Sequence, residues 1–498
     1  MEYRKPIEYG KDSVKAILKP SIPLDELSVS DDSNVTTENV IYKSSKSTTG
    51  AADKVGSDKP LIKINGALFT DIEYLCIDET GRIPKIKVIF TDSTGSLTGP
   101  NYPKNNPVMS VYIKTQNSKF KPIRCDFFIT NIRSTKTDDL ISDFIMSGEL
   151  FIPKIYNNVS KSYPNMTSTV ALVEVAKDNN LGFAENSFSA KDTMTWINTN
   201  KNSLDFIDDI GKHAYSNDNS FFNVFIDKYY HLNVVEVTQQ LDPSHEVNWT
   251  YTNTSHSAML NRSKEFTDLT GSKLEDQQTL LFLTNDENFQ GKPEYIQAYG
   301  LSGDIGSILK NKGFKRKIYY YDHMETSKKD VSWFIKPIMI KGYKSDAIPM
   351  VPENESLRNN VIKKWMNIDY GNTHSEWNTA EVINDHNISE LNKVKLIAKT
   401  DGINFQVIRG TGITVSIYLD SGVRSKQQSY RKVSDVLEED AIISESSRSI
   451  DDIVSGKYYV NGVKYFFDNN KEVNKYYTEF QLARVNWLPE NNMRLDAT

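Results

Sequence analysis

The chain has 498 residues, and its 59 Lys and Arg against 65 Asp and Glu give a net charge of −6. This balance excludes the strongly basic surface with which proteins capture nucleic-acid backbones by releasing counter-ions. The two cysteines, Cys76 and Cys125, exclude a disulfide framework and a cysteine-based zinc site, and their strand-like surroundings favour two small buried side chains. No apolar run approaches the roughly 20 residues of a membrane span, and none follows the N-terminus as in a secretory signal. We expect a protein that folds in a cytoplasm and does not insert into a membrane.

Residues 1–60 are predicted to form an N-terminal arm. From about residue 23 to residue 59, Ser, Thr, Asp, Asn and Gly dominate, as in the run SSKSTTG at 44–50. Such a segment cannot bury enough apolar surface to offset the entropy that ordering costs. We expect the arm to be largely extended or flexible on its own, and in an assembly it could lie along a neighbouring chain.

Residues 61–157 alternate apolar and polar side chains in short runs. These runs are rich in β-branched and aromatic residues and are bounded by Gly, Pro, Asn or Asp, which is typical of strands joined by turns. They cover 61–66, 85–90, 108–113, 125–130 and 142–156. The strand spacing predicts a first β-barrel-like domain over 61–157.

Residues 158–245 change to a helical period and predict an α+β domain. One helix starts near Thr167, with Ser168 or Thr169 as its N-cap, and stops at the turn residues 179–182. A second helix starts at Ser203. Its apolar face is formed by Leu204, Ile207, Ile210 and Ala214. A hairpin of two apolar strands, 221–227 and 232–237, follows.

The last half of the chain is harder to interpret. Residues 246–330 have weak periodicity and are expected to form an irregular connecting region, whereas 331–498 are expected to form a second β-barrel-like domain with an insertion at 421–455 that has an acidic centre. Within this domain the pattern predicts a strand in 330–343, a short helix over 359–366, and strands from Trp377 onward, including 393–398, 404–408, 413–419 and 477–485. Gly402, Gly410 and Gly412 are placed at bends. Asn461–Gly462 predicts a hairpin turn within 458–467.

A search for chemistry finds no motif of catalysis. No two of the seven histidines are spaced as local metal ligands, and no phosphate-binding or nucleophile motif occurs; Gly410–Gly412 precedes a strand and is interpreted as a turn. We interpret 438–440 as a solvated charge run, and Asp208 and Asp209 as the polar side of a helix. His386 with Asp385 and Glu390 has no supporting spacing. Trp196, Trp365 and Trp377 are interpreted as core or interface anchors. We therefore predict no catalytic, cofactor-binding or metal-binding residue, and no enzyme.

Several passages, in their order along the chain, resemble the baseplate (tail) hub proteins of contractile phage tails, a family that includes the hub part of type VI secretion spikes. The first block contributes PKIKVIFTDSTG (84–95), YP (102–103), VYIK (111–114) and SGELFIP (147–153). The middle block contributes LGF (181–183), WIN (196–198), NSLDFI (202–207), 221–227 and LNVV (232–235). The C-terminal likeness runs from residue 390 through the turns at Gly402 and Gly410. The likeness covers about two thirds of the chain, and the arm at 23–59, the 246–330 stretch and the 421–455 insertion have no counterpart.

The resemblance implies a structural protein of the virion tail baseplate, assembled in the host cytoplasm. Three copies, with two tube domains each, would form a homotrimeric ring that joins a sixfold tail tube to a threefold central spike. The implied partners are the tube protein, the central spike protein, and baseplate wedge and tape-measure proteins, and DNA only by passage through the channel. No cofactor is implied. The surplus of tyrosine, 26 residues, predicts tyrosines that are exposed in a lone chain and buried between subunits.

Two other functions stay open at this point. One is a tail-associated peptidoglycan hydrolase, which would require a rigid pair of carboxylates or a Cys–His pair. The other is a glycan-binding tail adhesin, for which sequence repeats would be typical, and we find none.

Overall fold

The computed structural model describes part of the chain. The described residues are 61–64, 67–68, 72–92, 108–114, 123–136, 141–186, 188–217, 220–241, 249–252, 279–283, 296–303, 315–321, 332–334, 340–341, 346–347, 361–367, 373–392, 394–405, 407–419, 449–450, 454–470 and 473–484. The predictions for the arm at 1–60 and for the carboxylates at 438–440 lie outside these residues.

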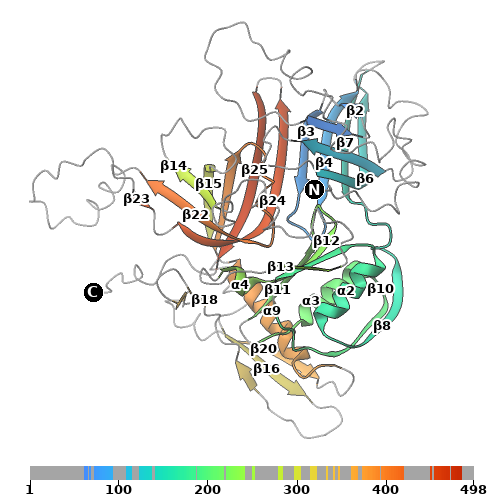
Figure 1. The fold of residues 1–498 in the computed structure, drawn as a ribbon, viewed down its shortest axis with the longest axis vertical. Helices are drawn as coiled ribbons and strands as arrows, with labels where there is room; N and C mark the ends of the chain where they lie inside the picture. Colours follow the sequence, from blue (N-terminus) through green and yellow to red (C-terminus); the bar gives the residue numbers. More distant parts are fainter. Residues whose placement is uncertain are drawn as a thin grey trace, which may run out of the picture.

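Most described strands belong to one 14-stranded sheet, in which strands from both ends of the chain lie side by side (Figure 1). Its N-terminal strands are β1 (Leu61–Ile64), β2 (Ala67–Leu68), β3 (Ile72–Asp78), β4 (Lys85–Asp92), β5 (Val108–Lys114), β6 (Ile123–Lys136) and β7 (Ser142–Leu150). Its later strands are β14 (Thr279–Leu283), β15 (Ile296–Gly303), β21 (Val394–Asp401), β22 (Gly412–Leu419), β23 (Ser449–Ile450), β24 (Gly456–Asn470) and β25 (Val473–Arg484). The main path runs β15-β21-β25-β24-β3-β4-β7-β6-β5-β1-β2, and β14, β22 and β23 join it beside β24.

The two halves of this sheet meet where β24 pairs with β3. The pairing is antiparallel and runs from Lys464 opposite Asp78 to Asp468 opposite Tyr74. Leu75, Ile77, Tyr465 and Phe467 are buried on one face, which covers the core, whereas Tyr74, Asp78, Lys464 and Phe466 on the other face are half-buried. Each buried large apolar side chain contributes roughly 1.5–3 kcal/mol. The mainly β class is therefore confirmed, whereas closure of the strands into barrels stays a prediction.

The middle of the chain folds as an α+β unit below the large sheet (Figure 1). A four-stranded sheet has the order β11-β12-β9-β13, and β8 pairs with β10 in a separate ribbon. The strands are β8 (Asn158–Met166), β9 (Gly182–Asn186), β10 (Met194–Asn202), β11 (Phe222–Ile226), β12 (His231–Glu236) and β13 (Trp249–Thr252). The helices are α2 (Ser168–Asp178), α3 (Ser203–His213) and the short α4 (Val237–Leu241). The predicted β11–β12 hairpin is confirmed, with Phe222 opposite Glu236.

Both predicted helices of the middle unit form, with local capping that explains their ends. Thr167, rather than Ser168 or Thr169, is the N-cap of α2, because its hydroxyl accepts a hydrogen bond from the backbone N–H of Val170. Asn180 takes the left-handed conformation, with φ at 55°, and so ends the helix as predicted. The remaining elements are α9 (Trp377–Leu391) and the small strands β16 (Lys315–Tyr321), β17 (Ser332–Phe334), β18 (Ile340–Lys341), β19 (Asp346–Ala347) and β20 (Val361–Asn367).

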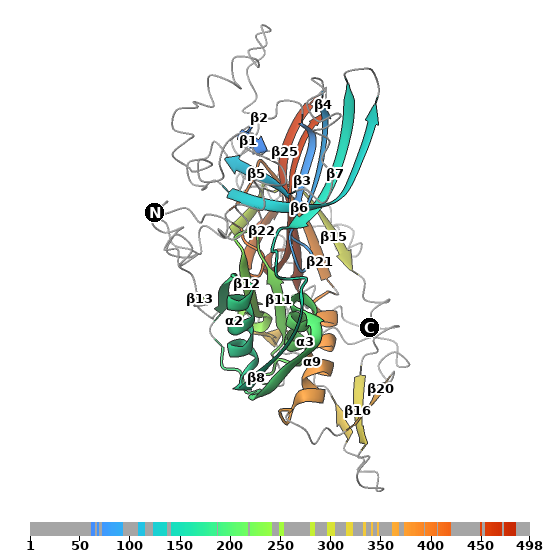
Figure 2. The same ribbon diagram turned by 90° about the vertical axis from the view of Figure 1, so that its right-hand side faces the viewer.

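Two predictions of element type in the later half are wrong. Residues 361–367 form strand β20, because they pair in parallel with β16, and the expected helix at 359–366 does not form there. Residues from Trp377 form helix α9, not strands. Its buried positions include Asn384, His386 and Asn387 beside apolar residues, so a search for apolar spacing cannot detect the helix. Figure 2 shows α9 packed beside α3.

The Asn461–Gly462 dipeptide is not a turn. It lies inside the long strand β24, at a bulge where the register with β25 shifts. A Cβ at position 462 would lie 2.6 Å from the Cγ2 atom of Thr80, so a residue without a side chain is needed for this close approach. Gly462 therefore allows β24 to approach the residue that follows β3, and so allows the two halves of the sheet to pack closely.

The expected strand at 404–408 is also absent among its described residues. Gly402 and Gly410 have φ values of 80° and 87°, as their placement at bends predicts. Between them, the backbone N–H of Asn404 donates to the hydroxyl of Thr478 at 2.8 Å, so a side chain replaces a strand partner. Residues 246–330 also differ from the expected irregular region, because β13, β14, β15 and β16 lie within it.

The tyrosines whose side chains the structure describes are mostly not exposed, against the expectation for a lone chain. Seven described tyrosines are buried: Tyr112, Tyr163, Tyr230, Tyr458, Tyr459, Tyr465 and Tyr476. Among the tyrosines whose side chains the structure describes, Tyr156 is the exposed one, at 45%. The buried phenol groups pack in the interior of a single chain, and several of them form hydrogen bonds between segments that are distant in the sequence.

Candidate functional site

The turn between β11 and β12 packs against both the N-terminal and the C-terminal part of the large sheet. Asp227 shapes the turn: its carboxylate accepts hydrogen bonds from the backbone N–H groups of Tyr229 and His231, both at 2.9 Å. Tyr230 takes a left-handed backbone conformation, with φ at 61°. The turn therefore has one fixed shape, which directs Lys228 and Tyr230 toward the large sheet.

Lys228 is the centre of a buried polar junction, by which we mean Glu79, Lys228 and Tyr465. Its ammonium donates to the carboxylate of Glu79 at 3.0 Å and to the phenol oxygen of Tyr465 at 2.9 Å. Its backbone N–H donates to the other oxygen of Glu79 at 2.8 Å. Glu79 follows β3, Lys228 belongs to the middle unit and Tyr465 lies in β24. One ammonium group therefore links three parts of the chain that are distant in the sequence.

The junction is shielded from water, so burial and the neighbouring charges determine the pKa values of its side chains. The side chains of Lys228 and Glu79 are 0% and 2% exposed. Burial alone lowers the pKa of Lys228, but the charge and hydrogen bonds of Glu79 outweigh it, so the pKa is raised and the ammonium stays charged. Burial raises the pKa of Tyr465, which keeps its phenol protonated. Removing one partner of such a pair costs about 3–5 kcal/mol, because the other charge stays buried without compensation.

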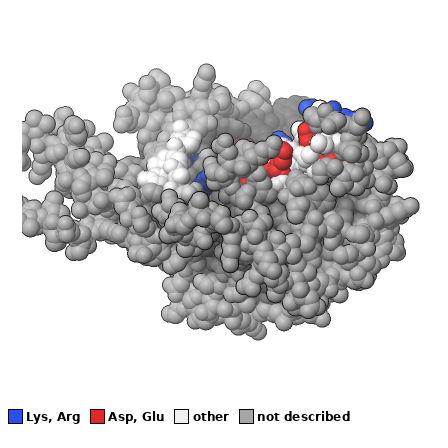
Figure 3. Space-filling model, turned by 90° about the horizontal axis from the view of Figure 1, so that it is seen from above, with Lys and Arg blue, Asp and Glu red and all other residues white. Residues whose placement is uncertain are grey.

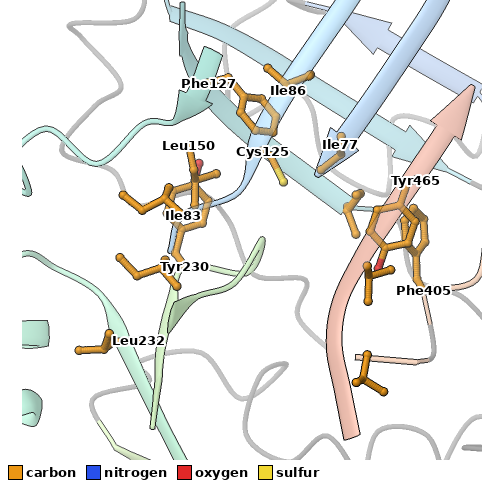
Figure 4. Packing of buried hydrophobic residues seen from close by; sticks show 14 of the residues in the cluster. Ile77, Ile83, Ile86, Cys125, Phe127, Leu150, Tyr230, Leu232, Phe405 and Tyr465 are labelled. Atoms are coloured by element: carbon orange, nitrogen blue, oxygen red, sulfur yellow. The ribbon is translucent and has the colours of Figure 1, made fainter. Parts of the chain in front are cut away.

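Further contacts join the same turn to β6. The phenol oxygen of Tyr230 accepts a hydrogen bond from the backbone N–H of Asp126 at 2.8 Å, and the thiol of Cys125 lies 3.4 Å from the carbonyl oxygen of Lys228. Figure 4 shows Tyr230 close to Ile83 and Leu150, next to Cys125 and Phe127. Polar contacts thus sit within an apolar core.

Both cysteines are buried, as predicted. Burial raises the pKa of Cys125 well above its usual range and that of Cys76 to about 11, so both are thiols at neutral pH. A thiol held in this form is a poor nucleophile. Cys125 therefore serves the packing of the β11–β12 turn.

A segment between β21 and β22 contacts the middle unit as well. The guanidinium of Arg409 lies 4.1 Å from the ring centroid of Phe225 and donates to the carbonyl oxygen of Gly81. The backbone N–H of Gly412 donates to the amide oxygen of Gln240 at 2.9 Å. A Cβ at position 412 would lie 1.9 Å from the carbonyl oxygen of Gln240, so only glycine fits. Gly410 lies in a turn, as the sequence predicts, whereas Gly412 is already the first residue of β22 and lies opposite Tyr459. Both glycines contact the middle unit.

Helix α9 docks on the middle unit through an aromatic cluster, formed by Trp196, His213, His374 and Trp377. The rings of His213 and Trp377 stack with centroids 3.6 Å apart, and those of Trp196 and Trp377 lie 5.6 Å apart. Burial lowers the pKa of both His213 and His374, which favours neutral rings. The tryptophans at 196 and 377 are thus anchors between segments, as their interpretation in the sequence predicts.

The remaining sequence candidates are not brought together into one site. Asp208 pairs with Arg82 and Asp209 with Lys201 on the outer side of α3, so both are surface carboxylates. His386 is buried in α9. Among the described side chains, no group of three or more His, Cys, Asp or Glu is placed to hold a metal ion. The helices that the structure describes include none long and apolar enough to span a membrane.

Sequence reasoning missed the polar junction altogether. Glu79 is 149 residues from Lys228, and Lys228 is 237 residues from Tyr465. A single lysine between two apolar strands is ordinary turn composition. The available sequence signal is that Asp227 and Glu79 are both acidic and both follow the end of an apolar strand. The sequence does not show that Glu79 lies next to Lys228, because that contact depends on the tertiary fold.

No protein-family model and no curated protein matches the sequence. Similar solved structures include the tail protein from Neisseria meningitidis MC58, which is 10% identical with a TM-score of 0.46, over 87% of this chain and 100% of that chain. The 43 kDa tail protein of prophage MuSo2 from Shewanella oneidensis is 8% identical with a TM-score of 0.48, over 86% and 99% of the two chains. The E. coli c3393 protein, a component of the type VI secretion system, is 8% identical with a TM-score of 0.40, over 84% and 76%.

Proposed function

We propose that this chain is a structural hub protein of a contractile tail baseplate. Three copies form a ring that joins a sixfold tail tube to a threefold central spike and surrounds the channel through which DNA passes. The order of the hub-like motifs along the sequence is the first support for this proposal. The observation in the structure that supports it best is the joining of an N-terminal and a C-terminal set of strands through β24 and β3.

Three points of geometry support a ring. The two sets of strands form one surface, so a single chain contributes two β units to it. The middle unit is tied to both sets by Lys228, which holds them in one orientation. Among the described strands, β15 pairs with β21 alone, so it leaves a sheet edge with mostly exposed residues. Open edges favour pairing with another chain, and closing the ring would cover them.

The proposed role is structural, without catalysis. Peptidoglycan zymography with the full chain tests this: we expect no clearing, and a clearing zone would contradict the proposal. The partners follow from the same proposal: the tail tube protein, the central spike protein, and baseplate wedge and tape-measure proteins. Assembly would take place in the host cytoplasm before the chain becomes part of the virion.

The ring itself is tested by the mass of the full chain in solution. One chain has a mass of 56.7 kDa, and the proposal predicts a species of three times that mass by sedimentation, alone or with its tube and spike partners. Averaged images of the particle should show threefold symmetry at the position of this protein.

A further inference from the structure

Helix α9 docks on the middle unit through two histidine rings. The Nδ1 atom of His213, the last residue of α3, lies 3.0 Å from the carbonyl oxygen of Trp377, the first residue of α9. The Nε2 atom of His374 lies 3.0 Å from the carbonyl oxygen of His213. A carbonyl oxygen only accepts hydrogen bonds, so each of these two ring nitrogens carries a proton and donates it. The docked state therefore fixes which nitrogen of each ring is the donor.

The second ring nitrogen of His374 is buried in the docked state. This Nδ1 atom forms no hydrogen bond within the part of the chain that the structure describes. His374 is 7% exposed, so bulk solvent gives the ring little screening. A neutral ring leaves a lone pair at this nitrogen, whereas a protonated ring would bury a positive charge and an N–H without an acceptor. The geometry at Nδ1 therefore opposes protonation of His374.

The helix ends act differently on the two rings. The carbonyl oxygen of His374 accepts a hydrogen bond from the backbone N–H of Trp377 at 3.1 Å, so His374 lies at the N-terminus of α9. The positive end of the helix dipole disfavours a cation there. His213 lies at the C-terminus of α3 and stacks on Trp377 at 3.6 Å, and both features favour a cation. His374 is therefore the ring whose protonation conflicts most with docking.

The carboxylates around the rings favour protonation but do not prevail. Asp192 and Glu376 act on His374, and Glu381 and Asp209 act on His213. Trp196 of β10, the remaining ring of the cluster, does not titrate. Asp192 is buried, and its carboxylate accepts hydrogen bonds from two backbone N–H groups, at 2.9 Å and 2.8 Å. Burial outweighs these carboxylates, so the pKa of both histidines is lowered.

The contact at the start of α9 belongs to a longer connection. The helix ends at Leu391, close before β21 begins at Val394, so it links the middle unit to the C-terminal strands of the large sheet. Further along the helix, the side-chain amide of Asn384 donates to the carbonyl oxygens of Lys212 and Ala214, at 2.8 Å and 3.0 Å. The histidine contact therefore holds the first turns of α9, and Asn384 holds its middle.

The described surface charges are placed differently from these rings. Seen from above, acidic and basic atoms of described residues lie at the surface of the molecule, where water and salt screen them (Figure 3). Ordinary carboxylates and ammonium groups also keep their charge between about pH 5 and pH 8, the range in which histidine changes its own. A change of pH within this range therefore acts on the contact between α9 and α3.

We propose that acid releases the first turns of α9 from the middle unit, because a proton on His374 has no acceptor in the docked state. In the released state the ring meets water and the rings of Trp196 and Trp377 separate. Release loosens the connection between the middle unit and the C-terminal strands. This inference does not depend on the proposed hub function, since all of its contacts lie within one chain.

The direction of the pH dependence follows from linkage. The released His374 takes up a proton near the ordinary value of 6.5, whereas the docked ring takes it up only at lower pH. Docking is therefore strongest above that pH and weakens as the pH falls below it. The carboxyls of Glu185 and Glu236 act in the opposite direction, because burial raises their pKa to about 7 and their contribution is lost as the pH rises.

Hydrogen exchange of the full chain, followed by mass spectrometry, tests the proposal. The opening constant of α9 is measured at about pH 7.5 and pH 5, with the intrinsic exchange rate at each pH divided out, across the range in which histidine titrates. We expect it to increase at least fivefold at the lower pH, against a limit of about 30-fold for one proton bound at pH 6.5. Helix α2 of the same unit is the internal control and should keep its protection.

Two variants locate the response. His374→Gln keeps an N–H donor for the carbonyl oxygen of His213 but does not titrate, so α9 should open equally at both pH values. His386→Gln is the matched control on the same helix. It lies nine residues from Trp377, half a turn away at 100° per residue, and should keep the full response. Glu185 and Glu236 are present in all of these proteins, so their titration cancels in the comparison.

Three results would overturn the proposal: equal opening of α9 at both pH values in the unchanged chain, a full response in His374→Gln, or an equal loss of protection in α2. If His374→Gln is already released at the higher pH, ring-labelled histidine is followed by NMR in the unchanged chain. The signal missing from His374→Gln identifies the ring. A titration midpoint below about 6.5 supports the proposal, and a midpoint at or above that value overturns it.

Discussion

Two ion pairs, Lys228–Glu79 in the buried junction and Lys85–Glu149 on the large sheet, use the same kinds of side chains in opposite surroundings. Lys228 and Glu79 meet at 3.0 Å without contact with water, whereas Lys85 and Glu149 meet at 3.3 Å with the lysine 59% exposed. Water screens the exposed pair, so it adds little stability. The buried pair cannot be separated without leaving an uncompensated charge. The first pair therefore fixes how three parts of the chain are arranged, whereas the second contributes little to the stability of the fold.

The largest expected effect is that of Lys228→Met, which leaves the carboxylate of Glu79 buried without its partner. We expect a loss of about 3–5 kcal/mol. The apparent Tm should fall by several degrees, and hydrogen exchange should rise at β3 and β24. The double variant Lys228→Met with Glu79→Gln should recover part of the loss, because no buried charge is left. A Tm equal to that of the unchanged chain would contradict the role given to this junction.

The packing between the two halves of the sheet is tested by Gly462→Ala. The added methyl group would lie 2.6 Å from the Cγ2 atom of Thr80, so strands must shift, at a cost of about 1–3 kcal/mol. Gly300→Ala on the edge strand β15 is the matched control, because nothing lies within 4 Å of a Cβ there. Thermal unfolding of both variants should show a lower Tm for Gly462→Ala alone; equal shifts would show that the close approach at Thr80 carries no cost.

Glu185 on β9 is a half-buried carboxylate that, unlike Glu79, has no lysine partner among the described residues. Its Oε2 atom has no hydrogen-bond partner among the described residues, and burial raises its pKa to about 7. The folded state therefore holds a proton that the unfolded state releases near pH 4.5. This contribution to stability is complete below that pH and is lost as the pH rises toward 7.

Glu185→Gln removes this titration. The Tm of the variant relative to the unchanged chain should rise between pH 5 and pH 7 and stay constant above, for the reason given by linkage. Glu236, whose pKa burial also raises to about 7, titrates in both proteins and so cancels in the comparison. A difference in Tm that does not change with pH would show that Glu185 carries no raised pKa.

The smallest expected effect is that of Lys85→Met. It is the same substitution as Lys228→Met, but it removes the lysine of the exposed Lys85–Glu149 pair. We expect a change in stability within about 1 kcal/mol. Thermal unfolding of both lysine variants side by side measures the contrast directly. A loss at Lys85 as large as that at Lys228 would remove the distinction between the two regions.

The sequence predicts the elements that have a regular period and local caps. Helices α2 and α3 and the β11–β12 hairpin have apolar spacing that matches their geometry, together with Thr167, Asn180 and Asn202 at their ends. Helix α9 was missed because it buries amides: the side chain of Asn384 donates to the carbonyl oxygens of Lys212 and Ala214. Gly462 was misplaced because the close approach of Thr80 is a tertiary contact. The candidate site depends on three parts of the chain meeting, which no local pattern encodes.

The central claim is that three copies of this chain form a ring between tail tube and spike. Sedimentation of the full chain mixed with its tube and spike partners tests it most directly. We predict a complex that contains three copies of the 56.7 kDa chain. A chain that stays monomeric in the presence of both partners would contradict the claim.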